Sequence, residues 1–210
     1  MTMTLIEKAT IMHYHRHRIA TYGPWTHEAL GWRAEASQRK RFEVLASVGD
    51  LTGCSVLDVG CGYGDLKGYL DQRVSAYTYI GIDQMPDFIA EAKARYQTSP
   101  NTSFCQADFT TVAFPRVDYV MASGALGYRC DTPGFYDAMI GKMYEAASRA
   151  LVFNMLDATW FPVHPLLTGH DCEAVVKFCR TLSPCVEVVR GYLADDFTVM
   201  VFRGLRRPRA

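Results

Sequence analysis

Three glycines at alternate positions follow a short apolar run that begins at residue 55. The run from Ser55 to Val59 is rich in buried-strand residue types, which predicts a β-strand. Gly60, Gly62 and Gly64 follow it, and a helix is predicted from Asp65 to Gln72. Glycines let the backbone pass close to a ligand, and the start of a helix offers free N–H groups. We therefore expect a nucleotide-like ligand at this loop.

The acid two positions before the first glycine, Asp58, narrows the choice of ligand. A carboxylate here repels the pyrophosphate of a dinucleotide, whereas it can hold an amine or a water molecule. The glycine spacing is G-x-G-x-G, whereas dinucleotide-binding folds use G-x-G-x-x-G, and position 65 is an aspartate. A nicotinamide-dependent oxidoreductase is thus the less favoured alternative.

Polar and aromatic residues also follow the next three predicted strands, at residues 77–82, 102–106 and 117–122. Asp83 can accept hydrogen bonds from both hydroxyls of a ribose. Asp108 can accept one from an exocyclic amine and Phe109 can stack on a purine, or the two are a turn residue and a core aromatic. Ligands of open α/β sheets bind outside the carboxyl ends of the strands, so these segments are expected to form one site.

Strands and helices alternate from residue 55 onward. Further helices are predicted at 86–96, 135–147 and 171–181, and further strands at 150–155, 186–192 and 197–202. This alternation indicates an α/β fold with a mainly parallel sheet covered on both faces. The last two strands are separated by only Leu193 to Asp196, and a connection of that length joins antiparallel neighbours.

The first 50 residues differ in composition and lack a strong strand pattern. We predict that residues 1–50 form a helical cap or lid and that residues 51–210 form the ligand-binding core, within a single domain overall. A helix is predicted over 28–48 from the spacing of its apolar residues. His13, His15 and His17 alternate, so they either share one face of an extended strand or belong to a flexible surface segment.

Composition places the chain among ordinary globular proteins. Of its 210 residues 49% are apolar, and 22 basic residues balance 22 acidic ones, so it has no overall attraction for nucleic acid or for an anionic membrane. The seven cysteines include no C-x-x-C pair, which argues against disulfides and a zinc site, and no metal is expected. We expect a cytoplasmic monomer or homodimer. The basic tail from Arg203 to Arg209 is interpreted as a solvated terminus.

Taken in order, these segments resemble the class I S-adenosylmethionine (SAM)-dependent methyltransferases, over roughly Ser55 to Met155 and the closing hairpin. The resemblance implies a Rossmann-like, doubly wound sheet of seven strands in the order 3-2-1-4-5-7-6 with strand 7 antiparallel. It also implies SAM as the cofactor, S-adenosylhomocysteine (SAH) as its product, and a set of binding residues. These are Asp58, Gly60, Cys61, Gly62 and Gly64 around the methionine part, Asp83 at the ribose, Asp108 at the adenine amine with Phe109 or Met85 packing on the ring, Ser123 and Gly124 near the sulfonium, and Gln84 with no part of the cofactor assigned to it.

The stretch from Leu30 to Phe42 is similar to a group of small bacterial methyltransferases of unassigned substrate, in which this helix packs over the cofactor. The resemblance implies that Gln38 or Arg41 holds the SAM carboxylate. The alternative is that both residues lie on a solvated helix face.

The residues after the fourth strand, Ala122 to Ala125, lack the Pro-Pro-aromatic sequence of DNA and RNA amino-methylating enzymes. No cysteine pair for pyrimidine 5-methylation and no Lys-Asp-Lys-Glu set is recognisable. The sequence therefore favours methyl transfer to an O or N atom of a small molecule over a nucleic-acid or protein acceptor or a non-catalytic SAM-binding module. The aromatic, proline-bearing insert Asp157 to Gly169 is a candidate acceptor pocket. We expect His164 and Tyr128 to face the acceptor as catalytic residues.

Overall fold

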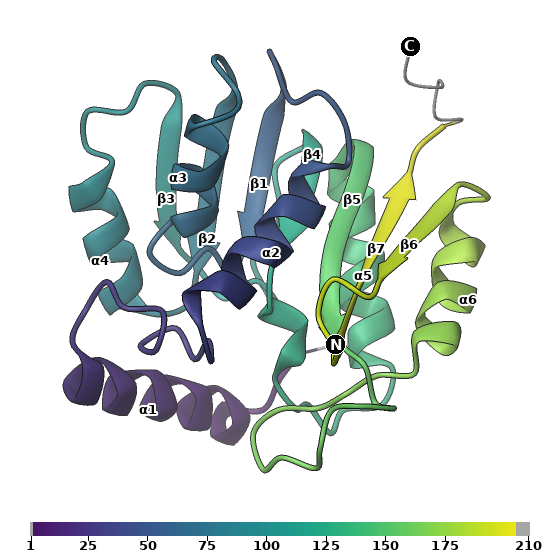
Figure 1. Ribbon diagram of the computed structural model, residues 1–210, viewed down its shortest axis with the longest axis horizontal. Helices are drawn as coiled ribbons and strands as arrows, with labels where there is room; N and C mark the ends of the chain where they lie inside the picture. The colour runs from purple at the N-terminus through teal and green to yellow at the C-terminus, as the bar shows by residue number, and fades with distance from the viewer. Residues whose placement is uncertain (1, 205–210) are drawn as a thin grey trace.

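The computed structural model describes residues 2–204, which form a seven-stranded sheet in the order β3-β2-β1-β4-β5-β7-β6 (Figure 1). β7 is antiparallel to β5 and to β6, and the other neighbours pair in parallel. The predicted strand order and antiparallel last strand are thus confirmed. The strands are β1 (Ser55–Val59), β2 (Thr78–Asp83), β3 (Thr102–Gln106), β4 (Val117–Ala122), β5 (Ala147–Leu156), β6 (Val186–Arg190) and β7 (Asp196–Phe202).

Helices cover both faces of the sheet. Successive side chains of each strand point to opposite sides, so each strand contributes residues to both apolar interfaces. In β1, Val56 packs in one apolar cluster and Leu57 in another. The cluster of Val56 includes residues of three helices, α2 (Glu35–Ala46), α3 (Asp65–Asp71) and α4 (Pro86–Arg95). The cluster of Leu57 includes residues of α5 (Phe135–Ala146) and α6 (Cys172–Leu182). A short 3-10 helix, η1 (Ala125–Gly127), follows β4.

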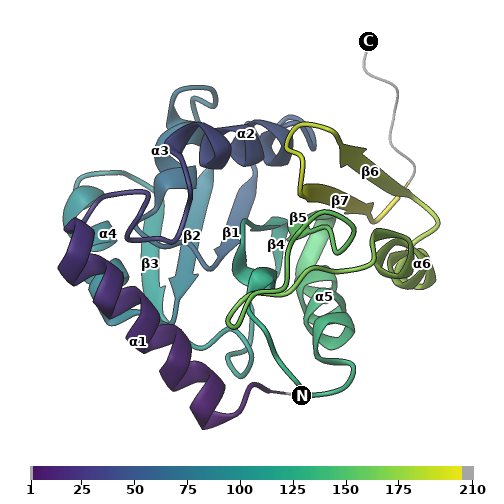
Figure 2. The same ribbon diagram turned by 60° about the horizontal axis from the view of Figure 1, so that its bottom comes forward.

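The first helix, α1 (Leu5–Tyr22), lies across the edge of the sheet at which the parallel strands end (Figures 1 and 2). It begins at a capping box, in which Thr4 and Glu7 each bond the backbone N–H of the other. Neither alternative for the three alternating histidines, a shared face of an extended strand or a flexible surface segment, is therefore what the structure shows, since all three lie on α1. On a helix, residues two positions apart face different directions, and only His15 of the three is buried.

The helix predicted over 28–48 is shorter than expected, since α2 covers Glu35–Ala46. The chain before it forms turns, with Gly31 at a φ of 90°. The other predicted helices and strands are present, with ends within a few residues of those expected. None of the helices in the described part of the chain is long and apolar enough to cross a membrane.

The basic tail is described only in part, because residues 205–210 lie outside the described range. Arg203 is less solvated than predicted: its guanidinium donates hydrogen bonds to the carbonyls of Tyr144 and Ala147 at the end of α5. The other arginines of the predicted tail cannot be compared with the structure.

Candidate active site

A cavity of about 600 Å³ opens at the edge of the sheet where β1, β2, β4 and β5 end. Its other walls come from α1, α2 and the turn before it, the insert between β5 and α6, and the β6–β7 loop. Figure 2, in which this edge comes forward, shows α1 and the insert on the two sides. Most predicted site residues line the cavity: Gln38, Arg41, Asp58, Gly60, Cys61, Gly62, Asp83, Gln84, Met85, Phe109, Ser123, Gly124, Tyr128 and His164. Gly64 and Asp108 do not.

The loop after β1 passes under the cavity with positive φ at all three glycines. A Cβ on Gly60 would lie 2.9 Å from the Cβ of Ala125, and one on Gly62 would lie 2.6 Å from Leu30. The backbone therefore approaches the neighbouring segments so closely that only glycine fits. Gly64 differs, since its α-carbon faces the rings of Phe104 and Tyr96 on the side away from the cavity. Gly64 is the N-cap of α3 and does not line the cavity.

Asp58 lies at the end of β1 with 2% of its surface exposed. Burial raises the pKa of its carboxyl to about 7, although the Tyr79 hydroxyl donates a 2.5 Å hydrogen bond to it and favours ionisation. Asp83 and Asp65 raise the pKa further by like-charge repulsion. A cationic group of a ligand would stabilise the ionised form of this acid.

Asp83, at the end of β2, joins two loops of the cavity. Its Oδ2 accepts a hydrogen bond from the Gly62 N–H, and its Oδ1 accepts one from the Met85 N–H, both at 2.9 Å. Each carboxylate oxygen has a second lone pair, so the side chain can still accept hydrogen bonds from two ligand hydroxyls. Burial raises the pKa of this carboxyl too.

Asp108, predicted to bind the adenine amine, is engaged elsewhere. Its Oδ2 forms a 2.6 Å ion pair with Lys8 of α1, and its Oδ1 accepts hydrogen bonds from Thr110. The neighbouring Phe109 does line the cavity. The assignment of Asp108 to the adenine stays a prediction. In this structure its carboxylate links α1 to the segment that follows β3.

The two α2 residues predicted to hold the cofactor carboxylate line the cavity but already have partners. The Gln38 amide nitrogen donates to Asp65 at 3.1 Å. Arg41 forms a buried ion pair with Asp196 at the start of β7, at 2.5 Å, and its guanidinium lies over the Trp32 ring. Burial raises the pKa of Asp196 to about 6, against the effect of the arginine. Neither of these two α2 residues therefore presents an unpaired positive charge to the cavity.

One cavity residue that sequence reasoning did not single out is His15. Its Nδ1 donates to the Ala29 carbonyl at 3.1 Å, so its Nε2 accepts the 2.6 Å hydrogen bond from the Tyr128 hydroxyl. Burial lowers the pKa of His15 to about 4 and raises that of Tyr128. The pair is neutral and joins α1 to the loop after β4. The sequence pattern of three alternating histidines did not predict this hydrogen bond. Only the helical structure shows that His15 is the one that faces inward.

His164 also lines the cavity, from the insert. Its Nδ1 accepts hydrogen bonds from the N–H groups of Leu166 and Leu167, at 3.1 and 3.0 Å. These two bonds fix the tautomer of the neutral ring, with the proton on Nε2.

Comparisons with known proteins agree with this geometry. A family model described as a methyltransferase domain matches residues 56–149. A putative methyltransferase of Mycobacterium tuberculosis is 32% identical over 158 residues, which cover 70% of this chain and 92% of that protein. This chain belongs to the SAM-dependent methyltransferases.

Two further proteins resemble parts of this methyltransferase or its fold. The magnesium-protoporphyrin O-methyltransferase of Rhodobacter capsulatus is 33% identical over 115 residues, 53% of this chain and 49% of that protein. The match thus spans about half of that relative. The crystal structure of magnesium protoporphyrin IX methyltransferase from Synechocystis with bound SAH superposes with a TM-score of 0.69 at 20% identity, over 94% of this chain and 100% of that chain. This last likeness concerns the fold.

The cavity of the methyltransferase fits a ligand of the size and polarity of SAM. Ligand cavities of this kind are typically about 300–1,000 Å³. Among the described residues, the buried Ser123 Oγ and Asn154 Nδ2 have no hydrogen-bond partner, and both residues lie in the cavity wall. A buried polar atom without a partner is costly, and a ligand bound in the cavity would remove that cost by supplying one.

Proposed function

We propose that this methyltransferase transfers a methyl group to an O or N atom of a small molecule. The observation that carries the proposal is one cavity whose wall contains both the glycine loop with its acids and two further segments, the insert and the β6–β7 loop. The part of the cavity beside these two segments is called the acceptor chamber in this proposal. A cavity of about 600 Å³ is of the size that small-molecule ligands occupy. Relatives named for trans-aconitate and magnesium protoporphyrin support this, although about half of each is matched.

SAM supplies a methyl group on a positively charged sulfur, which needs only a well-placed nucleophile. In our proposal the glycine loop holds its methionine part, Asp58 holds its ammonium group and Asp83 accepts its ribose hydroxyls. Phe109 and Met85 pack against the adenine. Ser123 Oγ obtains its missing hydrogen bond from the bound cofactor.

The enzyme contributes mainly by positioning the acceptor, an effect that supplies roughly 7–11 kcal/mol in well-oriented reactions. Tyr128 and His164 face the acceptor in this proposal. Because the Tyr128 hydroxyl proton is donated to His15, its oxygen lone pairs remain available to the acceptor.

Thermal unfolding with added ligands tests the cofactor part of the proposal. SAH at 100 times its Kd is expected to add about 2.7 kcal/mol to the free energy of unfolding. For a chain of this size that raises Tm by roughly 5–10 °C. NADH is expected to leave Tm unchanged. A shift with NADH and none with SAH would refute the proposal.

Turnover tests the catalytic part. His164→Ala and Tyr128→Phe are each expected to lower methyl transfer to an acceptor at least about tenfold, because the acceptor is less well positioned, with SAH affinity unchanged. Unchanged turnover in both variants would remove these two residues from the mechanism. Full SAH binding without transfer to any acceptor would instead favour a non-catalytic SAM-binding module.

A further inference from the structure

Asn154 lies near the end of β5 in the wall of the cavity, with 1% of its surface exposed. The N–H of Gly124 donates a 2.8 Å hydrogen bond to its side chain. Because a backbone N–H can only donate, the atom that receives this bond is Oδ1, and the orientation of the amide is fixed. The Nδ2 group is then left without a partner among the described residues. Asn154, a residue of the cavity wall, thus holds a buried donor of fixed orientation without a partner among the described residues.

A buried donor of this kind costs about 1–3 kcal/mol unless a ligand brings an acceptor atom. An oxygen atom satisfies it, whereas an ammonium group does not, because both groups would be donors. Asn154 comes from β5, next to the insert and the β6–β7 loop that line the acceptor chamber. The acids proposed to contact the cofactor, Asp58 and Asp83, lie on β1 and β2, whereas Asn154 lies on β5, so the oxygen atom is assigned to the methyl acceptor.

Among the described side chains that line the cavity, both histidines already have hydrogen-bond partners. The Nε2 of His15 is bonded to Tyr128, and the Nδ1 of His164 accepts two backbone N–H groups. At the β6–β7 loop, Asp196 is held by Arg41 in a buried ion pair. An acceptor that arrives already ionised needs no base.

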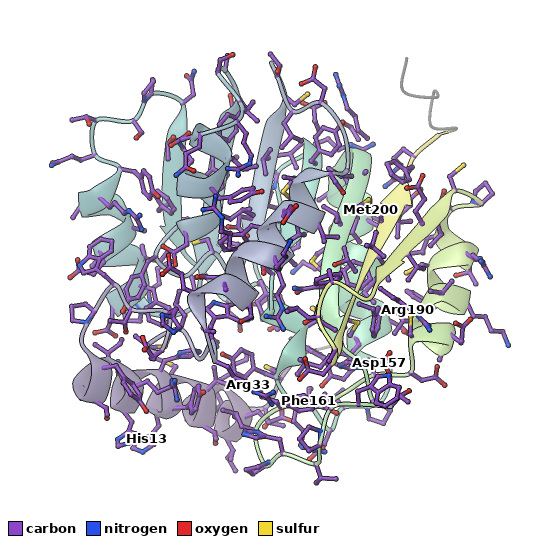
Figure 3. All side chains as sticks on the ribbon, viewed as in Figure 1. His13, Arg33, Asp157, Phe161, Arg190 and Met200 are labelled. Atoms are coloured by element: carbon purple, nitrogen blue, oxygen red, sulfur yellow. The ribbon has the colours of Figure 1, made fainter. Side chains whose placement is uncertain are left out.

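Arg33 supplies a positive charge at the same chamber. It belongs to the turn before α2 and lines the cavity, yet 72% of its side chain is exposed. Its only ion-pair contact among the described residues is one of 3.3 Å with Asp195. Figure 3 shows it beside Phe161 of the insert, and its guanidinium lies 5.9 Å from that ring. A guanidinium with unused N–H groups is well suited to a carboxylate.

We propose that the methyl acceptor is a small-molecule carboxylate, bound by the Nδ2 group of Asn154 and the guanidinium of Arg33, and that the product is its methyl ester. This inference rests on the proposed function. One carboxylate oxygen forms the new O–CH₃ bond with its lone pair while the S–CH₃ bond breaks, and the electron pair of that bond stays on sulfur. No proton is released. An anion and a cation become two products without net charge, a change that surroundings less polar than water favour.

Binding of matched probes to the SAH complex tests this inference. The complex is titrated by NMR with benzoate, benzyl alcohol and benzylamine, which share one ring and differ in the reacting group. We expect benzoate to bind at least about tenfold more tightly than the other two, equivalent to about 1.4 kcal/mol. Asn154→Asp keeps an oxygen for the Gly124 N–H but removes the donor, so this preference is expected to disappear while SAH affinity is kept.

Two further variants keep the test decisive. Asn101→Asp makes the same chemical change at an exposed loop and is expected to keep the benzoate preference. Arg33→Gln changes an exposed side chain, so it remains informative if Asn154→Asp does not fold, and it is expected to weaken benzoate several-fold without affecting benzyl alcohol.

The outcomes separate this inference from the proposed function. If SAH does not bind the wild-type protein, the proposed function fails and the inference fails with it. If SAH binds but benzoate has no advantage over the alcohol and the amine, the inference alone is overturned. The same holds if Asn154→Asp weakens SAH as much as benzoate, because Asn154 then serves the cofactor carboxylate.

Discussion

The carboxyl of Asp58 makes cofactor binding sensitive to pH near neutrality. Its pKa is raised to about 7 by burial, so about half of the free protein carries the protonated form at that pH. In the proposed site the ammonium of the cofactor pairs with the ionised form. The affinity for SAH is therefore expected to fall as the pH drops below 7, by up to about tenfold per pH unit.

Calorimetric titration of SAH from pH 6 to 8.5 measures this effect. Asp58→Asn removes the titrating group, so its weaker affinity is expected to be nearly independent of pH over this range. A wild-type affinity that stays constant from pH 6 to 8.5 would contradict the pairing of Asp58 with the ammonium.

Gly124 lies at a position where the backbone conformation and a close neighbouring ring both require glycine. Its φ is 77°, and a Cβ there would lie 2.7 Å from the ring of Trp32. Gly124→Ala is expected to lower the free energy of unfolding by about 1–3 kcal/mol through backbone strain and displacement of the ring. Urea unfolding measures it. Gly141→Ala is the matched control, because that helical glycine has open space around it and is expected to gain about 0.5–1 kcal/mol.

At the scale of elements, most of the fold could be predicted from the sequence. β1 and β2 are short apolar runs, the first followed by glycine and the second ending in an acid, and the brief connection before β7 required an antiparallel hairpin. α1 was missed because it carries no apolar stripe; within it only Ile11 and His15 are buried. Its capping box, Thr4 and Glu7, was nevertheless visible in the sequence and indicates a helix start.

The candidate site could be predicted only in part. Residues at strand ends were identified because parallel strands end at one edge. Two ion pairs, Lys8–Asp108 and Arg41–Asp196, join residues that are 100 and 155 positions apart in the chain. No local sequence pattern predicts such pairs. The same holds for Asn154, whose importance depends on the Gly124 N–H that fixes its amide.

Docking of α1 is expected to weaken in acid because of His15. In the folded protein its pKa is about 4, against 6.5 for an exposed histidine. The unfolded chain thus takes up a proton below pH 6.5 that the folded chain refuses until about pH 4. The free energy of unfolding is expected to fall by about 2 kcal/mol between pH 8 and 5 from this residue alone.

Urea unfolding at several pH values checks this expectation. His15→Gln is expected to lose that part of the pH dependence. His13→Gln, at an exposed position of the same helix, is expected to keep it. Identical pH profiles for wild type and His15→Gln would show that the buried imidazole does not control the docking of α1.

For the whole molecule, the division into residues 1–50 and 51–210 has a physical consequence for unfolding. Met3 and Ile11 pack in the apolar cluster of β1 and α5, while Phe42 and Leu45 pack in the cluster on the other face of the sheet. The N-terminal segment is thus part of both cores. We propose that the cap and the core unfold together as one unit, since neither can leave without exposing buried apolar surface of the other.

The three tryptophans allow this to be tested, because Trp25 and Trp32 lie in the N-terminal segment and Trp160 lies in the insert. Their fluorescence reports the segments around the cavity, whereas far-ultraviolet circular dichroism reports the helices and the sheet as a whole. Urea transitions followed by the two methods are expected to coincide in midpoint and in slope. A fluorescence transition at lower urea would show a cap that opens independently of the sheet. SAH would then be expected to move that early transition toward the main one, since the cavity it occupies is walled by both parts.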